Sequence, residues 1–306
     1  MKIIYNIFCG KVCAFIIILT LFCGCIDDNY NCSRPTGTLL RFTYTLNTRY
    51  TDLFDEQVNS LALFFYDEQG NHILTKDISI EDLDEENRLY LELLPNNYRV
   101  IVWGNLNEAY FGWRDPRYIS NFRLDLLCGD NGEVTNSFGT LFHGATLVNV
   151  TEDVTEEHSI DLVKNTNTIH VIMEGEESGT RNSAHFASIT GCNGSYDIDN
   201  NPVAESTPLQ YKANYLTLTS ATQADFTIMR LFSDDDLTLS LGWNGMNGDI
   251  SIKSLAAELM KHPEINTNDD LDRWDEYTLT YKKDTHGVIT LIKINDWDVI
   301  SNPGGI

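Results

Sequence analysis

Three cysteines and two aspartates lie close together near the start of the chain, in the stretch from Leu21 to Cys32, LFCGCIDDNYNC. A cysteine thiol can bind a metal, pair in a disulfide, act as a nucleophile or carry a lipid. Cys25 directly follows Gly24, and an apolar run precedes both residues. A small residue before a cysteine at the end of such a run is the cleavage context of a bacterial lipoprotein. We therefore predict lipidation as the chemistry of Cys25.

The residues ahead of Cys25 have the composition of an export signal. Lys2 and Lys11 supply the positive charge, and Val12 to Phe22 form the apolar segment. A transmembrane helix needs about 20 apolar residues, so this segment is too short to span a bilayer. Residues 1–24 are therefore predicted to be removed, which leaves Cys25 as the first residue. Two alternatives remain open: a cleavage that ends at Cys23, and a secreted protein cut after Gly24 without a lipid.

The aspartates after Cys25 indicate where the lipidated protein resides. A single acyl chain binds a membrane weakly, whereas a lipoprotein cysteine carries a diacylglycerol and an amide-linked acyl group such as palmitate. The sequence CIDD resembles the surface-export signal of lipoproteins in Bacteroidota-type bacteria. We therefore expect a lipid anchor in the outer membrane and an outward-facing protein.

Charge and cysteine content limit the possible functions. Loss of residues 1–24 removes Lys2 and Lys11 but no acidic residue, so the formal net charge changes from −24 to −26. Such a surface repels phosphates, which excludes nucleic acid as a partner. The remaining cysteines, Cys32, Cys128 and Cys192, allow one disulfide with a free thiol or three reduced thiols. No CxxC pair is present outside the signal, which disfavours a zinc ribbon or a redox motif.

Alternation of apolar and polar residues predicts an all-β protein. Leu40, Phe42, Tyr44 and Leu46 alternate with polar residues, as in a half-buried strand. The same pattern or a short apolar run recurs in VNSLALFFY, RLYLELL, YRVIVWG, HSIDLV, TIHVIME, YLTLTS, DFTIMRL, LTLSLGW, EYTLTYK and VITLIKI. Turn residues separate most of these runs, including Asp67 to Asn71 and the PNN after Leu94. We expect consecutive antiparallel strands arranged as sandwiches.

The length of the mature chain, about 280 residues, favours two domains. The polar stretch Lys164 to Thr168 is the predicted joint, which gives a first sandwich at 37–164, a second at 165–306 and a leader at 25–36. A helix is expected only in SLAAELMKH, with Ser254 as its N-cap. The segment SIEDLDEE, from Ser79 to Glu86, is expected to form a turn or two of helix.

Several of these segments together resemble the anchor and accessory subunits of type V fimbriae. The resemblance rests on CIDD, LLRFTYTLN, VNSLALFFYDEQGN, LELLPNNYRVIVWGN, LFHG and IKINDW, and it is clearest over residues 25–165. A glycine often stands in this family where the chain has Asn96 or Asn97, and asparagine also tolerates a left-handed conformation.

The resemblance implies two tandem transthyretin-like, immunoglobulin-like β-sandwiches without a cofactor or catalytic activity. It also implies assembly by strand donation, in which an anchor accepts a strand from a shaft subunit. After Trp297 the chain continues only as DVISNPGGI. Pro303, Gly304 and Gly305 are poor strand formers, so we expect a subunit that terminates or anchors a filament and donates no strand itself.

The sequence contains only weak signals for a metal site. His143, His158 and His170 match no helical zinc motif, and isolated histidines on alternating strands are usually structural. The stretch Asp197 to Asn201 begins like a calcium loop, but Pro202 occupies the position of the required glycine and Pro208 that of the closing glutamate. Two acid-rich stretches, Ser233 to Asp236 and Asn268 to Glu276, are expected to be solvated loops. We therefore expect no metal.

Two alternative functions remain besides the fimbrial one. A surface glycan-binding lipoprotein of a polysaccharide-uptake system would share the lipid anchor and the β-sandwich fold. Its candidate residue is Trp113, predicted to lie in a loop, because Trp103 and Trp297 stand at strand ends and are expected in the core. A glycosidase is the third alternative, since paired carboxylates leave no spacing signature in a sequence.

Overall fold

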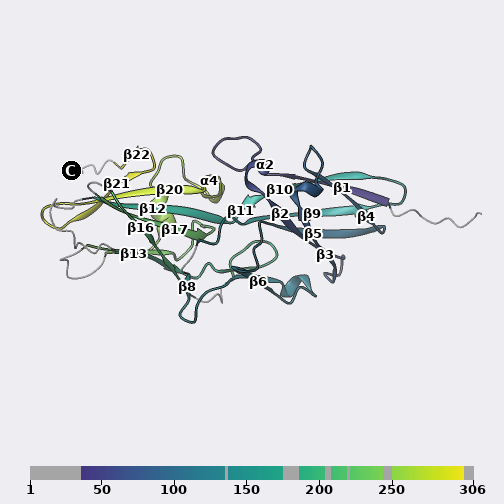
Figure 1. Cartoon of the computed structure of the whole chain (residues 1–306), viewed down its shortest axis with the longest axis horizontal. Helices are drawn as coiled ribbons and strands as arrows, with labels where there is room; N and C mark the ends of the chain where they lie inside the picture. The colour runs from purple at the N-terminus through teal and green to yellow at the C-terminus, as the bar shows by residue number, and fades with distance from the viewer. Residues whose placement is uncertain are drawn as a thin grey trace, which may run out of the picture.

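The structure is a computed structural model, and it describes residues 36–134, 137–174, 186–203, 208–218, 221–243 and 250–299. Its strands form five sheets. Figure 1 shows an elongated molecule, with strands β1 to β5 and β9 to β11 toward one end and strands β12 to β22 toward the other. The predicted all-β sandwich class is confirmed.

The first sandwich consists of two sheets. Sheet A has the strand order β10-β1-β4, and sheet B has the order β11-β9-β5-β2-β3. The strands of sheet A are β1 (Thr36–Thr43), β4 (Arg88–Leu93) and β10 (Glu156–Asp161). The strands of sheet B are β2 (Ser60–Tyr66), β3 (His72–Ser79), β5 (Asn96–Gly104), β9 (Phe142–Val150) and β11 (Val163–Lys164). The predicted turn from Asp67 to Asn71 joins β2 to β3, with Gly70 in a left-handed conformation.

The expected pairing of consecutive strands is wrong at the PNN turn. β4 pairs with β1 in sheet A, whereas β5 pairs with β2 and β9 in sheet B. The turn therefore carries the chain from one layer of the sandwich to the other. Asn96 and Asn97 belong to β5, and neither adopts a left-handed conformation. Alternation fixes which face of a strand is buried, but it does not identify the strand's neighbour.

The central strands β2 and β5 of sheet B are buried on both faces. Leu63 and Phe65 of β2 point into the core between sheets A and B, while Phe64 and Tyr66 point into a second core on the opposite face. In β5, Val100 and Val102 alternate in the same way with Ile101 and Trp103. A strand with two buried faces needs an unbroken apolar run rather than alternation. This explains the unbroken apolar runs LALFF in β2 and VIVW in β5.

The second sandwich packs a six-stranded sheet F on a five-stranded sheet E. Their orders are β16-β17-β12-β20-β21-β22 and β19-β18-β13-β15-β8. Sheet F comprises β12 (Thr166–Glu174), β16 (Asn214–Thr217), β17 (Ala221–Met229), β20 (Glu276–Lys283), β21 (Ile289–Ile294) and β22 (Trp297–Asp298). Sheet E comprises β8 (Glu133–Val134), β13 (Phe186–Gly191), β15 (Leu209–Lys212), β18 (Thr238–Gly242) and β19 (Ile250–Ile252).

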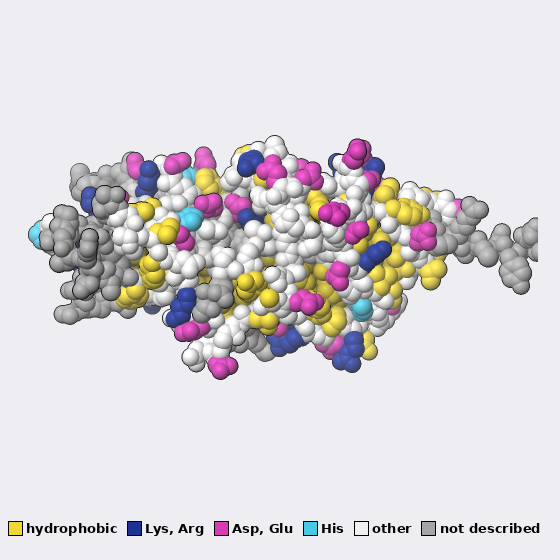
Figure 2. Space-filling view, viewed as in Figure 1, with side chains coloured by type: hydrophobic (Ala, Val, Ile, Leu, Met, Phe, Trp, Pro, Cys, Tyr) yellow, Lys and Arg dark blue, Asp and Glu magenta, His cyan; other side chains and the backbone are white. Residues whose placement is uncertain are grey.

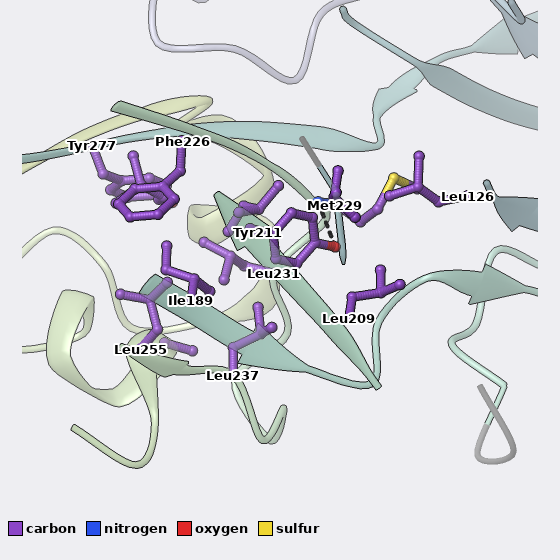
Figure 3. Close-up of a cluster of buried hydrophobic side chains, with 14 of the residues drawn as sticks. Leu126, Ile189, Leu209, Tyr211, Phe226, Met229, Leu231, Leu237, Leu255 and Tyr277 are labelled. Atoms are coloured by element: carbon purple, nitrogen blue, oxygen red, sulfur yellow. Dashed lines mark hydrogen bonds between the residues drawn. The ribbon is translucent and has the colours of Figure 1, made fainter. Parts of the chain in front are cut away.

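Residues from the first half of the chain enter the second half's core. A small sheet D, of order β14-β7-β6, combines β6 (Phe111–Arg114) and β7 (Arg123–Leu126) with β14 (Ser195–Tyr196). Figure 3 shows Leu126 of β7 beside Met229 and Leu209, while the hydroxyl of Tyr211 accepts a hydrogen bond from the Met229 N–H at 3.4 Å. The chain also passes from sheet B to sheet F at Asn165, between β11 and β12. A division into domains at residue 164 remains a proposal.

Short helices complete the fold. The expected helix after Ser254 is confirmed as α3 (Leu255–Leu259), and the Ser254 hydroxyl accepts from the Ala257 N–H at 3.1 Å. The acid-rich stretch after Thr267 was predicted to be a solvated loop, and this prediction is wrong. The helix α4 (Asn268–Arg273) begins there with a capping box. The other helices in the described residues are α2 (Phe54–Gln57), η1 (Ile80–Asp82) and η2 (Ile119–Asn121). η1 confirms the expected helical turn after Ser79. In the described part of the chain no helix is long and apolar enough to cross a membrane.

Substitution of Gly144 by alanine should destabilise the first sandwich. A Cβ atom at Gly144 would lie 2.7 Å from Ile160 Cγ2 and 2.7 Å from Leu162 Cδ2, so the alanine overpacks the contact between β9 and β10. Overpacking of this kind costs about 1–3 kcal/mol. The midpoint of urea unfolding measures the effect. Gly129→Ala is the matched control, because the nearest atom to its Cβ would be the Glu133 carbonyl oxygen at 3.8 Å. Equal midpoints for the two variants would contradict the prediction.

Candidate strand-docking site

The chain's own first strand occupies the centre of sheet A. β1 pairs antiparallel with β4, from Thr36 opposite Leu93 to Arg41 opposite Arg88. On its other side β1 pairs in parallel with β10. Leu40 and Phe42 of β1 are fully buried, as the alternation predicted. An incoming strand therefore finds the middle of sheet A already filled by β1.

Sheet B leaves an edge available at β9. β5 pairs with β9 along its whole length, from Asn96 opposite Val150 to Gly104 opposite Phe142. On the other side of β9, β11 pairs only with Phe142 and His143. Within the described residues, no strand pairs with the rest of this side, which we call the open β9 edge (residues 145–150). Backbone groups on such an edge can bond another extended chain.

The open β9 edge exists because the following strand leaves sheet B. β10 and β11 follow each other directly, with only Leu162 between them, and they run antiparallel to β9. β11 stays in sheet B, but β10 turns away to pair with β1 in sheet A. Beside Gly144 the two segments touch, since the side chains of Ile160 and Leu162 fill the space of a missing Cβ. β11 therefore occupies the position beside Phe142 and His143 of β9, and no described strand occupies the position beside residues 145–150.

A cavity of about 570 Å³ reaches β9 from the side of β5 and the β2–β3 turn. Leu147, Val148 and Asn149 of β9 and His158 of β10 line one part of it, and Asp67 to Gly70, Asn97 to Arg99 and Ile119 line the rest. Leu147 is 75 % exposed although it is a large apolar residue, whereas Val148 is buried. The His158 Nε2 atom is buried without a hydrogen bond, and the nearest carboxylate oxygen, from Glu156, is 3.9 Å away. The edge thus combines unpaired backbone, exposed apolar surface and an unsatisfied side-chain nitrogen.

Acidic residues surround this edge. Glu152, Glu156 and Glu157 are exposed in the loop after β9 and at the start of β10. Arg99, also in the cavity lining, is paired with Asp199, and Arg88 is shared among Asp84, Glu86 and Glu157. Figure 2 shows hydrophobic side chains interspersed with Asp and Glu over the end of the molecule that β1 and β4 form. The local charge is therefore negative.

Trp113 lies on a strand, which corrects the predicted loop. It is in β6 and pairs with Leu124 of β7. Its ring packs edge-on against Phe64 at 5.9 Å and is half-buried. A second cavity of about 540 Å³ is lined by Trp113 together with the side chains of Asp77, Asp82 and Glu108. Trp103 is fully buried and Trp297 is partly buried against the core, consistent with their predicted core roles.

The three histidines lie in separate places. His143 is buried between the sandwiches, His158 lines the cavity at β9, and His170 lies on sheet F. Partial burial lowers the pKa of His170, but hydrogen bonds to Asp225 at 2.6 Å and Glu276 at 2.9 Å outweigh it and raise the pKa above its ordinary value. Among the described residues, no group of three or more His, Cys, Asp or Glu side chains is arranged to hold a metal.

The acidic stretches form hydrogen-bonded turns. Asp197 accepts from the N–H groups of Asp199 and Asn201, both at 2.9 Å, which closes the turn that was compared with a calcium loop. Asp235 accepts from the Phe232 and Leu237 N–H groups. Burial raises the pKa of Asp235 to about 6. The prediction that this stretch is a solvated loop is therefore wrong for Asp235.

The predicted cysteine sites are only partly described. Cys25 and Cys32 lie outside the described residues. Cys128 is exposed and Cys192 is half-buried, and no disulfide joins the two. Lipidation of Cys25 stays a prediction.

Polar contacts hold the two sandwiches in a fixed relation. His143 of β9 donates from Nε2 to the Ile198 carbonyl at 3.2 Å, and its ring packs on Trp103 at 4.6 Å. The Arg273 guanidinium of α4 donates to the Asn47 carbonyl at 3.3 Å and covers the Tyr50 ring at 4.6 Å. Within the second sandwich, a bidentate ion pair between Arg230 and Asp272 at 2.6 and 2.5 Å fixes α4, which carries Arg273.

Comparison with known proteins agrees with this all-β architecture and identifies a class of fimbrial proteins. The family model of the fimbrillin-A-associated anchor proteins Mfa1 and Mfa2 matches residues 29–303. The chain therefore belongs to the fimbrillin-A-associated anchor protein family. No curated protein sequence matches it significantly.

Solved structures share the fold at low sequence identity. The fimbrial anchor protein Mfa2 from Porphyromonas gingivalis superposes with a TM-score of 0.70 at 16 % identity, over 86 % of this chain and 98 % of that one. A proposed adhesin from Bacteroides ovatus gives 0.75 at 20 % identity, over 86 % and 95 %. A protein from Bacteroides thetaiotaomicron, proposed to bind polysaccharides, gives 0.73 at 18 % identity, over 84 % and 95 %. At these identities the similarity establishes the fold alone.

The open β9 edge was not predicted from the sequence. One signal for it exists in LVNV, where Leu147 is apolar although it lies on the same face of β9 as Ala145 and Asn149, opposite to Val148 and Val150. An apolar residue on the exposed face of a strand can indicate a contact surface. Finding it would still have required knowledge that β10 pairs with β1, which is a contact between distant segments.

Replacement of His143 should change how stability depends on pH. Burial lowers the pKa of His143 from 6.5 to about 4. The unfolded chain therefore binds a proton between these values that the folded chain does not bind. The contribution of His143 to the free energy of unfolding is fully present above pH 6.5. It falls by roughly 3 kcal/mol in total as the pH drops toward 4.

The variant His143→Gln can still donate to the Ile198 carbonyl but does not titrate. Its free energy of unfolding should fall less than that of the wild type between pH 6.5 and 4, as measured by urea denaturation at several pH values. Asp235 and the other carboxyl groups are common to both proteins, so the difference isolates His143. Val288→Ala, at an exposed position that does not titrate, is the control and should retain the wild-type pH dependence. Identical slopes for His143→Gln and the wild type would contradict the assignment.

Proposed function

We propose that this protein is a non-enzymatic fimbrial subunit that anchors or terminates a surface filament at the outer membrane. A lipid on Cys25 would hold it to the membrane, and a strand donated by a shaft subunit would hold the filament to it. The observation that carries the proposal is membership of the fimbrillin-A-associated anchor family over residues 29–303.

The arrangement of the chain supports a tether at Cys25. The leader enters the fold directly at β1, whose buried residues Leu40 and Phe42 fix it in the centre of sheet A. A pull on the leader therefore acts on a strand that is bonded on both sides. A peripheral or frayed N-terminal segment would transmit such a pull poorly.

The arrangement of the sheets supports acceptance of a strand. β-augmentation needs an edge with unpaired backbone groups and adjacent apolar surface. Sheet B offers both at the open β9 edge, because β10 pairs with β1. The family is one of anchor proteins rather than enzymes, which favours a binding role over catalysis.

Replacement of Cys25 by serine should release the protein from the membrane. Serine cannot form the thioether to the lipid, so Cys25→Ser should shift the protein from the outer-membrane fraction to the soluble fractions and the filaments to the medium. Immunoblots of fractions and electron microscopy of cells measure this. Cys32→Ser, in the same leader, is the matched control and should remain membrane-bound. A Cys25→Ser protein that still fractionates with the membrane would overturn the lipid anchor.

The anchoring role has a separate test. Deletion of the whole gene should give filaments that are shed from the cell or altered in length. Filaments that stay cell-bound at normal length after deletion would refute the anchoring function.

A second candidate function, binding of a surface glycan, is favoured by the cavity at Trp113. A half-buried tryptophan beside Asp77, Asp82 and Glu108 combines a stacking surface with hydrogen-bond acceptors for hydroxyl groups. A structural neighbour from Bacteroides thetaiotaomicron is itself proposed to bind polysaccharides.

If this cavity binds glycans, Trp113→Ala should abolish retardation of the protein in gels that contain the polysaccharide. Tyr118→Ala is the control, since Tyr118 is an exposed aromatic residue outside the cavity lining. A wild-type protein that no polysaccharide in a broad panel retards would remove this candidate.

A further inference from the structure

We propose that the segment donated by a shaft subunit docks on the open β9 edge and carries basic residues on its outward-facing side. This inference rests on the proposed function, and it adds where the strand binds and what chemistry it has. The segment would continue sheet B in the position that β11 fills beside Phe142 and His143 and that β10 leaves empty.

The backbone geometry favours β9 over the other strands of the first sandwich. β1 has partners on both sides, and β5 and β2 are also interior to their sheet. Apart from β11, the other edge strands of this sandwich are β3 of sheet B and β4 and β10 of sheet A, and each has one partner. The exposed residues of β3 and β10 include charged side chains, as in HILTKDIS and EEHSID, while β4 exposes Tyr90 and Glu92. β3 also lines the cavity at Trp113, but the cavity at β9 is the one of the two with an exposed leucine in its lining.

The two sides of the docked segment would meet different surroundings. Side chains on its inner face would approach the buried, apolar Val148 and the unsatisfied His158 Nε2. Side chains on its outer face would lie beside Leu147. Successive residues of a strand alternate between faces, so one face of the segment should be apolar and should include a group that can bond the His158 nitrogen.

Charge determines the remaining positions of the segment. Glu152, Glu156 and Glu157 are exposed around the edge, and the nearby Arg99 is already paired with Asp199. The edge therefore presents a net negative field, which speeds the approach of a positive segment and repels a negative one. Lysine or arginine at the solvent-facing positions of the donated segment satisfies this condition.

Site-specific photo-crosslinking in filament-producing cells tests the proposal on the full-length protein. The probe is a benzoylphenylalanine residue placed at Leu147, at Arg41 on the outer face of β1, or at Val288 in a distant turn. Leu147, Arg41 and Val288 are exposed, so the probe should not disturb folding. We expect Leu147 to yield a crosslink to a terminal, lysine- or arginine-containing segment of a filament subunit, identified by mass spectrometry, and Val288 to yield none.

The charge requirement is tested separately with Glu152→Lys combined with Glu156→Lys. This variant should capture filament subunits about tenfold more slowly, whereas the exposed control Glu264→Lys should match the wild type. An unchanged rate in the double variant would overturn the basic character of the segment. As a check without any substitution, backbone amides at residues 145–149 should exchange hydrogen faster in the isolated protein than in filament-bound protein.

Failure of this inference can be told apart from failure of the proposed function. A crosslink to a filament subunit from Arg41 but not from Leu147 would overturn the docking position and leave the anchoring function intact. A crosslink from Leu147 to a second copy of this chain would overturn the choice of partner. If neither probe captures a filament subunit and gene deletion leaves filaments attached, both the inference and the anchoring function fail.

Discussion

Burial of the central strands of sheet B, β2 and β5, on both faces is the constraint on which the rest of the structure depends. In β2, Phe65 packs against sheet A while its neighbour Phe64 packs against sheet D and the second core. A sheet buried in this way joins two hydrophobic cores through one layer, so neither sandwich can move independently without exposing large aromatic surfaces. The contacts of His143 with Ile198 and of Arg273 with Asn47 then set the orientation.

The same constraint explains where the sequence was informative. Alternation in LRFTYT identified the buried face of β1 correctly at Leu40 and Phe42, because one face of sheet A is solvated. The helix after Ser254 was also predictable, since its N-cap and apolar spacing are local signals. The PNN turn was misread because short connections usually join paired strands, whereas this one crosses between layers. Sheet D was missed altogether, since its strands are short and its partner β14 lies far along the chain.

The candidate site could not be read from the sequence for a related reason. A strand edge is open when no other strand pairs with it. Pairing between strands that are distant in the sequence gives little local sequence signal. The parallel ladder between β1 and β10 joins residues more than a hundred positions apart, such as Leu40 and His158. That pairing takes β10 out of sheet B and leaves residues 145–150 of β9 without a second neighbouring strand among the described residues. The prediction for Cys25, in contrast, rests on a short local motif, because it requires only a signal segment and an adjacent small residue.

The position of β1 connects the tether with the docking edge. A lipid on Cys25, as proposed, would pull along β1 from its first residue, and both β4 and β10 resist that pull through ladders that lie parallel to the force. Such a load acts on all the ladder bonds together instead of opening them one at a time. The open β9 edge belongs to the other layer of the same sandwich, so a strand docked there would load sheet B while the lipid loads sheet A. If the tether and the docking edge are as proposed, the shared core of Leu40, Phe42, Leu63 and Phe65 would carry the force between membrane and filament, because both sites then belong to the same sandwich.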